Sequence, residues 1–323
     1  MRAMQLHQLN EPMQLDDIPA PDPKPGEVQV RVHTCGINFG DTLIVQGKYQ
    51  EKFALPFTPG MEICGTVSAL GDGVSGLAIG TRIAAYGGTG GLAEYTCLAA
   101  DRCIPVPDNM PDDQVAAFLV AYGTSHVALD YRAKLQKGET LLVLGASGGI
   151  GLTAVELGKL MGAKVIAVAR GQAKLDIARQ AGADHLIDSE TQDIREIVKS
   201  LGGADVVYDP VGGDQFKAAM RACNPEARII PLGFASGDIP QIPANILLVK
   251  NITVIGFYWG GYATFAPKVL INSFTELFKM YAAGNLHPHV SHILPLEQAN
   301  EALALLRDRK STGKVVVQVY SAA

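Results

Sequence analysis

A glycine-rich segment at residues 145–151 has the residue types and spacing of a turn that binds pyrophosphate. Residues 141–144 before it are all apolar, as in a short buried parallel strand, and apolar residues at helical spacing follow it. Gly148 lets the backbone approach phosphate oxygens, and Gly151 lets the helix pack close to the strand. Free N–H groups at the helix start supply partial positive charge, so this turn needs no cationic side chain.

The surroundings of this turn favour a dinucleotide as its ligand. Against the pattern G-x-G-x-x-G the chain has alanine at the first position and glycine at 148 and 151, and a second apolar strand at 165–169 completes a βαβ unit. The alternative is a tight turn that binds nothing. We predict that the cofactor contacts the turn at Ala146, Ser147, Gly148, Gly149, Ile150 and Gly151.

The end of the second strand indicates which dinucleotide binds. A site for NAD places Asp or Glu about 20 residues beyond the glycines, where it accepts hydrogen bonds from the ribose 2′-OH. This chain has Arg170 there, with Lys174 four residues later, and two cations suit the 2′-phosphate of NADPH. The alternative is a pair of solvated cations at a helix start, and Asp176 and Asp188 nearby would weaken a phosphate site. We predict NADPH as the cofactor.

Length and composition bound the class of protein. The chain has 323 residues, more than one hydrophobic core usually serves, so two domains are expected. Lys and Arg total 27 against 32 Asp and Glu, and the formal charge of −5 gives no general attraction for nucleic acid. Five cysteines without a C-x-x-C pair, and no export signal in residues 1–20, indicate a cytoplasmic protein with reduced thiols. No apolar run approaches the roughly 20 residues that span a bilayer.

The distribution of strands and helices predicts an α/β fold in three consecutive parts. Residues 1–122 read as short strands separated by glycine and proline, which predicts a β-rich, partly barrelled domain. Residues 123–260 alternate strands and helices, as in a doubly wound parallel sheet. Residues 261–323 are too short for a domain and are expected to return to the first one. They offer two helices and a final strand, at residues 265–284, 296–307 and 314–319.

The order of these motifs carries a resemblance that covers essentially the whole chain. The matching stretches are residues 35–41 with Gly47 and Tyr49, residues 59–62 with Gly65, and residues 145–151, 208–213 and 313–316. The chain resembles the zinc-free quinone oxidoreductases (zeta-crystallin-like) of the medium-chain dehydrogenase/reductase superfamily. The resemblance implies a discontinuous GroES-like catalytic domain, a Rossmann domain of six parallel strands, and a nicotinamide in the cleft between them. It also implies a homodimer joined through residues 251–257, although that apolar run equally suits an interior strand.

The residue types predict that the chain holds no metal. Zinc-dependent relatives have cysteine where this chain has Asn38 and histidine where it has Met61, and neither amide nor thioether suits catalytic Zn²⁺. A structural zinc site would need four cysteines, and only Cys97 and Cys103 fall in the relevant region. Residues 287–292 contain three histidines, but a proline and strand alternation separate them, which indicates a solvated turn.

Without a metal, the reaction needs an acceptor that takes hydride readily, such as a quinone or an enone. Asn38 is the first candidate for holding a substrate oxygen because its amide donates without titrating. The family match adds Asp41, Tyr49 and Thr124, with Thr124 near the nicotinamide. The alternatives are a turn brace for Asp41, a satisfied aromatic for Tyr49 and a helix cap for Thr124.

The resemblance also implies secondary cofactor contacts from Gly233, Phe234 and Lys314. Phe234 equally suits the core, and Lys314 equally suits a solvated surface. Leu43 departs from the pattern, since several relatives have tyrosine there beside the substrate cleft. This departure bears directly on which acceptor the chain reduces.

Three functions remain open at this point. The first is an NADPH-dependent oxidoreductase that transfers hydride to a quinone or a related α,β-unsaturated carbonyl. The second is an enoyl reductase that acts on acrylate, haloacrylate or an acyl thioester. The third is a protein that retains NADPH and binds a partner such as RNA without turnover. The acidic balance of the chain disfavours RNA, and no membrane partner is expected.

Overall fold

The chain forms two compact units, which we describe separately. The structure is a computed structural model that describes residues 1–320. The first unit comprises Met1–Val120 together with the chain from Pro288 onward, and the second comprises Ala121–His287. The chain crosses from the first unit to the second after Val120, two residues before the expected boundary after residue 122. The second crossing follows His287 instead of residue 260, so the helical segment between these positions belongs to the second unit.

Helix α10 (Pro267–Ala282) accounts for the later crossing. Its buried residues, Leu270, Ser273, Phe274 and Leu277, follow helical spacing along one face. Ser273 Oγ lies 2.9 Å from His126 Nδ1, and the Phe274 ring meets Trp259 edge-on, with ring centroids 6.2 Å apart. The periodicity of this segment predicts a buried face, but it carries no information about which unit buries that face.

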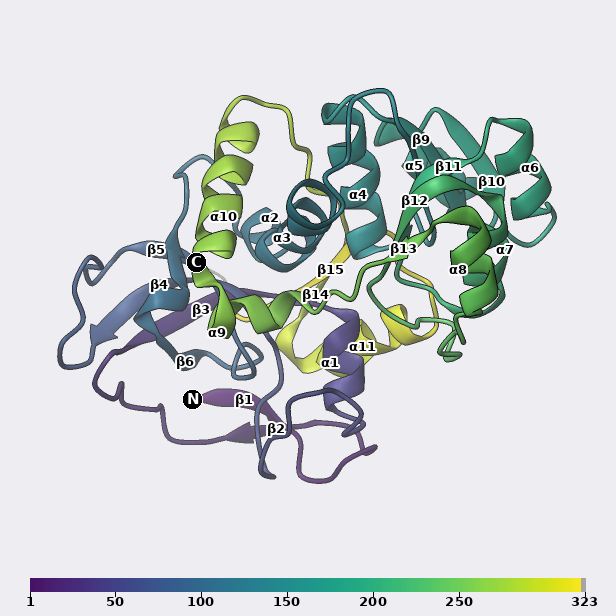
Figure 1. The fold of residues 1–323 in the computed structure, drawn as a ribbon. Coiled ribbons are helices and arrows are strands. Elements are labelled where there is room, and N and C mark those ends of the chain that lie inside the picture. Colours follow the sequence, from purple (N-terminus) through teal and green to yellow (C-terminus); the bar gives the residue numbers. More distant parts are fainter. Residues whose placement is uncertain (321–323) are drawn as a thin grey trace. The chain divides into compact units, whose positions relative to one another are not determined.

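The second unit is built on six parallel strands in the order β10-β9-β8-β11-β12-β13, seen in teal and green in Figure 1. The strands are β8 (Thr140–Val143), β9 (Lys164–Ala169), β10 (His185–Asp188), β11 (Ala204–Asp209), β12 (Cys223–Pro231) and β13 (Thr253–Val254). The connecting helices are α4 (Gly149–Leu160), α5 (Gln172–Gln180), α6 (Ile194–Ser200), α7 (Gly213–Ala222) and α8 (Ala244–Lys250). This arrangement confirms the predicted doubly wound parallel sheet.

The remaining helical segments of this unit come before the first strand or after the last strand of the sheet in the sequence. They are α3 (Leu119–His126), which spans the first crossing, a π-helical turn at Val127–Arg132, a 3₁₀ turn at Trp259–Gly261, α9 (Tyr262–Phe265) and α10. All apolar residues of the interior strand β8 are buried, as expected for a parallel sheet covered on both faces. No helix within residues 1–320 combines the length and apolar character needed to cross a membrane.

Strand β13 forms one edge of the parallel sheet in the described chain. Thr253 and Val254 pair with Arg228 and Ile229 of β12, and β13 closes the strand order on that side. The apolar run at residues 251–257 is therefore an edge strand within the chain, with only two residues in the ladder.

The first unit contains a mostly antiparallel sheet in the order β14-β15-β3-β4-β5-β7, with β6 also pairing with β3. Its strands are β3 (Glu27–Ile37), β4 (Glu62–Leu70), β5 (Arg82–Tyr86), β6 (Tyr95–Ala99), β7 (Cys103–Pro105), β14 (Val290–Pro295) and β15 (Lys314–Gln318), beside the hairpin β1 (Arg2–Gln5) and β2 (Gln14–Asp17). Its helices are α1 (Phe39–Ile44), α2 (Asp112–Val115) and α11 (Ala299–Arg307), with 3₁₀ turns at Ala100–Arg102 and Leu296–Gln298. Burial alternates along most of β3, as expected for a half-buried strand.

Candidate active-site residues

The glycine-rich turn of the second unit connects β8 to α4. Gly145 has a φ of +60°, which favours glycine, and its carbonyl accepts a 3.0 Å hydrogen bond from the Gly148 N–H. Gly148 is the extended N-cap residue, and α4 begins at Gly149. The first turn of a helix leaves backbone N–H groups without intrahelical acceptors, and these groups attract an anion. The turn therefore has the geometry of an anion-binding helix start.

Gly148 and Gly151 serve this turn in different ways. A Cβ added to Gly151 would lie 2.2 Å from the Gly145 carbonyl oxygen, so only glycine lets α4 pack this close to β8. A Cβ added to Gly148 would meet the same oxygen at 3.4 Å, which is an ordinary contact. The protein itself therefore has room for a side chain at 148 but not at 151.

The residues predicted to bind a 2′-phosphate lie at the end of β9. Arg170 follows the last residue of β9, and α5 begins two residues later with Gly171 as its N-cap at a φ of +73°. A Cβ on Gly171 would meet no atom within 4 Å, so the space in front of this turn is open. Arg170 is partly exposed, and Lys174 lies in the first turn of α5. The structure thus places both cations at the predicted end of β9.

Asp209 is a buried carboxylate at the end of β11 in the same unit. Its Oδ1 accepts hydrogen bonds from the Val211 and Gly212 N–H groups at 2.8 and 2.9 Å, whereas its Oδ2 has no hydrogen-bond partner among the described residues. Burial raises the pKa of Asp209 to about 6 from its ordinary value of 3.8. A raised pKa in the folded protein means that stability is lost as the pH rises from about 4 to 6.

We expect Asp209→Asn to flatten this part of the pH–stability profile. Asparagine keeps an acceptor for the two N–H groups but does not ionise, and a shift from 3.8 to about 6 corresponds to about 3 kcal/mol. Urea unfolding of both proteins between pH 4 and 7 measures the difference. Burial also raises the pKa of Asp41 to about 6, so the ionisation of Asp41 still contributes to the slope in both proteins. Identical slopes in the two proteins would contradict the expectation, whatever constant offset the new amide adds.

Lys314 is the centre of a buried polar network in the first unit. Pairing of β15 with β3 brings it beside Asn38, and its Nζ donates to Asn38 Oδ1 at 2.6 Å and to Glu62 Oε2 at 2.9 Å. The Lys314 side chain is 6% exposed and that of Glu62 is fully buried. Lys314 is therefore an interior ammonium that pairs with a buried carboxylate.

Asn38 has its amide fully engaged in the same network. Its Oδ1 accepts from Lys314, and its Nδ2 donates to Glu62 Oε2 at 3.0 Å and to the Gly36 carbonyl at 3.3 Å. Asn38 also forms the N-cap of α1, where its backbone N–H donates to Asp41 Oδ2 at 2.8 Å. The network therefore holds the start of α1 in place.

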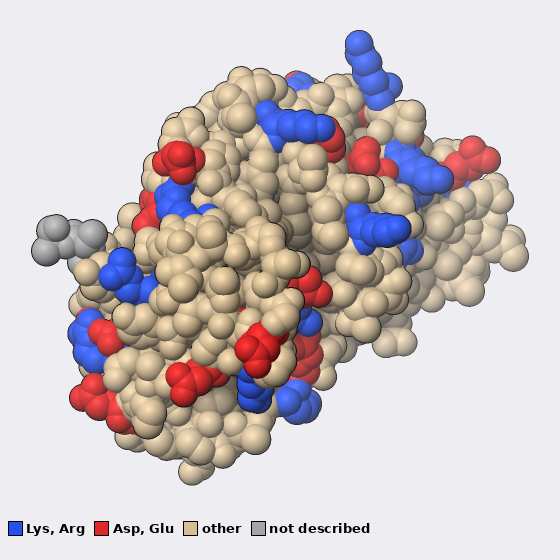
Figure 2. Space-filling view, turned by 90° about the vertical axis from the view of Figure 1, so that its left-hand side faces the viewer, with Lys and Arg blue, Asp and Glu red and all other residues tan. Residues whose placement is uncertain are grey.

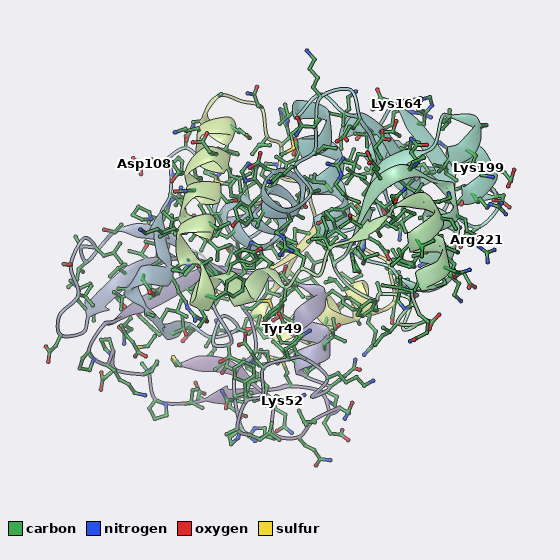
Figure 3. All side chains as sticks on the ribbon, viewed as in Figure 1. Tyr49, Lys52, Asp108, Lys164, Lys199 and Arg221 are labelled. Atoms are coloured by element: carbon green, nitrogen blue, oxygen red, sulfur yellow. The ribbon has the colours of Figure 1, made fainter. Side chains whose placement is uncertain are left out.

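Tyr49 and Lys52 lie in the loop after α1, where Figure 3 labels both. Tyr49 is half-buried, and a Cβ on Gly40 would lie 3.2 Å from its ring and 2.8 Å from the Met61 methyl group. The Lys52 Nζ donates to the Gly47 carbonyl. The tyrosine ring and the Met61 thioether thus both pack over the first turn of α1.

The remaining predicted site residues belong to the second unit. Thr124 is buried on α3, and the neighbouring Ser125 hydroxyl donates to the Ile150 carbonyl at 2.9 Å, which brings this part of α3 to the first turn of α4. Gly233 and Phe234 follow β12, and the Phe234 ring would lie 3.2 Å from a Cβ on Gly212. Thr124, the glycine-rich turn and Arg170 share one unit, whereas Asn38, Asp41 and Lys314 cluster in the other.

Glu62 and Asp209 are two buried residues that the sequence prediction did not include among the site residues. Glu62 is the first residue of the mostly apolar strand β4 and Asp209 the last residue of β11, and a buried charge at either position requires partners. That position is the signal that would have identified them.

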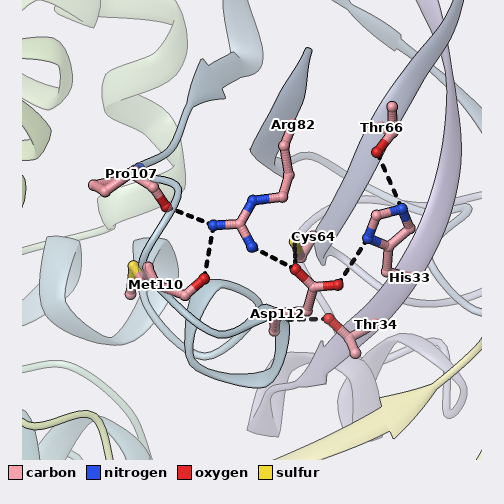
Figure 4. Close-up of polar contacts among 8 residues, drawn as sticks. All are labelled: His33, Thr34, Cys64, Thr66, Arg82, Pro107, Met110 and Asp112. Atoms are coloured by element: carbon pink, nitrogen blue, oxygen red, sulfur yellow. Dashed lines mark hydrogen bonds and ion pairs between the residues drawn. The ribbon is translucent and has the colours of Figure 1, made fainter. Parts of the chain in front are cut away.

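Histidines occur at two places that bear on metal binding, the segment at residues 287–292 and a cluster that combines a histidine with a cysteine and an aspartate. His287, His289 and His292 contact three separate partners, Glu156, Thr312 and Ser291. In the cluster, ligand atoms of His33, Cys64 and Asp112 lie within 4.8 Å of one another (Figure 4).

Arg82 already supplies positive charge to the cluster of His33, Cys64 and Asp112. Its Nη1 lies 2.6 Å from Asp112 Oδ1, and it also donates to the carbonyls of Pro107 and Met110 (Figure 4). The hydrogen bond from His33 is the main cause that lowers the pKa of Asp112 to about 2, while burial raises the pKa of the Cys64 thiol far above its usual range. A protonated thiol and a guanidinium-paired carboxylate are poor metal ligands.

Comparisons with known proteins extend over nearly the whole chain. Residues 24–108 match the alcohol dehydrogenase GroES-like domain, and residues 149–276 match the zinc-binding dehydrogenases. The quinone oxidoreductase-like protein 2 homolog of Nematostella vectensis is 41% identical over 98% of this chain and 88% of its own length.

Two solved structures share this fold. The quinone oxidoreductase of Escherichia coli, in complex with NADPH, is 28% identical, with a TM-score of 0.93 over 99% of this chain and 100% of its own. That of Thermus thermophilus, determined alone and in complex with NADPH, is 31% identical, with a TM-score of 0.88 over the same shares.

Proposed function

Because this chain belongs to the quinone oxidoreductase family of the medium-chain dehydrogenase/reductase superfamily, we propose that it is an NADPH-dependent oxidoreductase. Its substrate is a quinone or a related α,β-unsaturated carbonyl, which accepts hydride without help from a metal ion. The observation that carries the proposal is the glycine-rich turn, where a Cβ on Gly148 would make only an ordinary contact with the protein, so a glycine there suits the close approach of a phosphate. The named relatives with NADPH support the choice of cofactor.

The residues of the second unit fit NADPH in two places. The first-turn N–H groups of α4 would hold the pyrophosphate, and Arg170 with Lys174 would hold the 2′-phosphate. Bound there, the nicotinamide supplies the hydride that the reaction consumes. The protein contributes orientation, hydrogen bonds and exclusion of water.

The residues of the first unit do not fit a catalytic zinc ion. Although residues 149–276 match zinc-binding dehydrogenases, Asn38 and Met61 supply an amide and a thioether in place of thiolate and imidazole. Glu62, the carboxylate bonded to the Asn38 side chain, is already paired with the Lys314 ammonium. An ammonium within 3 Å of both Asn38 and Glu62 would repel a divalent cation, so we propose a zinc-independent reaction.

Within this proposal the polar residues divide into two roles. The amide of Asn38 has its hydrogen bonds inside the network, so Asn38, Asp41 and Lys314 hold the start of α1. Contact with the substrate oxygen is assigned to Tyr49, and contact with the nicotinamide to Thr124. Leu43, half-buried on α1, favours keeping the enoyl reductase as a second candidate, since it offers no hydroxyl where several relatives have one.

Consumption of NADPH, followed optically beside NADH, tests the proposal. A small quinone, a simple enone and an acryloyl thioester are offered separately, and we expect faster turnover with NADPH and with the quinone. Prior dialysis against EDTA is expected to leave the rate unchanged. Turnover of only the enone or the thioester would select the enoyl reductase instead. No turnover with any acceptor would favour a binding protein. RNA is a poor candidate for its partner on the face drawn in Figure 2, because Lys and Arg are interspersed there with Asp and Glu.

A further inference from the structure

We propose that Glu190 moderates the NADPH preference of this chain by competing with the 2′-phosphate of NADPH for the Arg170 guanidinium. The inference rests on the proposed function, because it concerns the same phosphate site. Glu190 belongs neither to the glycine-rich turn nor to the expected pair of cations.

The backbone fixes the loop of Glu190 beside the loop of Arg170. Strands β10 and β9 are parallel neighbours in which Asp188 pairs with Ala169, so the residues that follow them leave the sheet side by side. The Ser189 N–H donates to the Ala169 carbonyl at 2.9 Å. Asp188 Oδ1 accepts from the N–H groups of Gly171 and Glu190 at 3.2 and 3.0 Å, so one carboxylate ties the two loops together.

The side chains of Arg170 and Glu190 form a loose, exposed ion pair on these loops. Arg170 Nη1 lies 4.0 Å from Glu190 Oε1, and the two side chains are 39% and 57% exposed. Such a pair is weak, so a dianionic phosphate, which binds a guanidinium in bidentate fashion, would displace the carboxylate. The fixed loop nevertheless keeps the negative charge of Glu190 close to the phosphate.

This arrangement affects NADPH and NADH unequally. Repulsion between the carboxylate and a bound 2′-phosphate opposes NADPH, whereas NADH carries only a hydroxyl at that position. The carboxylate that binds this hydroxyl in NAD sites stands at the end of the second strand, where this chain has Arg170, so the effect of Glu190 is expected to act on NADPH. Glu190 therefore shifts the balance toward NADH, against the preference that Arg170 and Lys174 create.

Binding measurements on Glu190→Gln test the inference without reference to turnover. We expect this variant to bind NADPH and 2′,5′-ADP roughly three- to tenfold more tightly than the unaltered chain, while the affinity for NADH stays level or falls. The matched control is Glu196→Gln on α6, which removes the same charge from another exposed pair, with Arg195 at 3.7 Å. That control is expected to change neither affinity.

The double variant Arg170→Gln/Glu190→Gln supplies the decisive comparison. If Glu190 acts mainly through Arg170, Glu190→Gln brings a clearly smaller gain in 2′,5′-ADP affinity once the guanidinium is gone, because only the direct repulsion is then relieved. An equal gain in both backgrounds, or an unchanged NADPH to NADH ratio in Glu190→Gln, would overturn the inference while leaving the proposed function intact. An unaltered chain that binds neither dinucleotide would overturn both.

Discussion

Replacing Lys314 by methionine is expected to destabilise the first unit by about 3 to 5 kcal/mol, the usual cost of removing one partner of a buried ion pair. The ammonium lies 2.9 Å from the buried Glu62 carboxylate and 2.6 Å from Asn38 Oδ1. Methionine keeps much of the side-chain volume but leaves that carboxylate without its counter-charge. Urea unfolding, followed by circular dichroism, measures the loss.

A second substitution separates charge from packing. Glu62→Gln in the Lys314→Met background removes the unpaired charge and keeps one carbonyl oxygen for the Val120 N–H, which donates to Glu62 Oε1 at 2.8 Å. The new amide NH2 replaces the oxygen that accepts from Asn38 Nδ2, and it can donate to Asn38 Oδ1 if the Asn38 amide turns over, since Lys314 no longer occupies that oxygen. We expect this double variant to recover much of the lost stability. Equal stability of the single and double variants would show that packing dominates at Lys314. As a control, Lys279→Met removes an exposed pair with Glu276 and is expected to cost less than about 1 kcal/mol.

The buried network around Lys314 also shows where prediction from the sequence ends. Lys314 and Glu62 are 252 positions apart, and they meet only because β15 pairs antiparallel with β3 and β3 with β4. A lysine beside an apolar strand has the same pattern whether its ammonium lies in solvent or in the interior. The resemblance suggested a cofactor contact for Lys314, and the structure gives its ammonium partners in the first unit.

Features encoded within a short segment were predicted more completely. The βαβ unit, the apolar strands at 141–144 and 165–169, and the placement of Arg170 all follow from residues within about 30 positions of one another. The second crossing between the units was not encoded in this way. Helix α10 presents one apolar face, and its contacts with His126 and Trp259 depend on residues more than ten positions away.

The two glycines of the turn give the strongest test of how cofactor binding relates to the fold. Gly151→Ala would place a methyl group 2.2 Å from the Gly145 carbonyl oxygen, so α4 must move away from β8. Overpacking of this kind lowers the free energy of unfolding by about 1 to 3 kcal/mol. The N–H groups in the displaced first turn of α4 would then no longer point toward the phosphate. We expect both a lower unfolding midpoint and loss of NADPH binding, measured by urea unfolding and by nucleotide fluorescence.

Gly148→Ala is the matched control, because its methyl group meets the same oxygen at 3.4 Å and Gly148 has a φ of −81° that alanine adopts freely. The fold should therefore keep its stability, while the methyl group occupies space that the pyrophosphate needs. We expect NADPH to bind roughly tenfold more weakly or worse, a loss of about 1.4 kcal/mol or more. Unchanged NADPH affinity in Gly148→Ala would mean that the cofactor does not approach this turn, and a large loss of stability would mean that glycine is needed there for the fold itself.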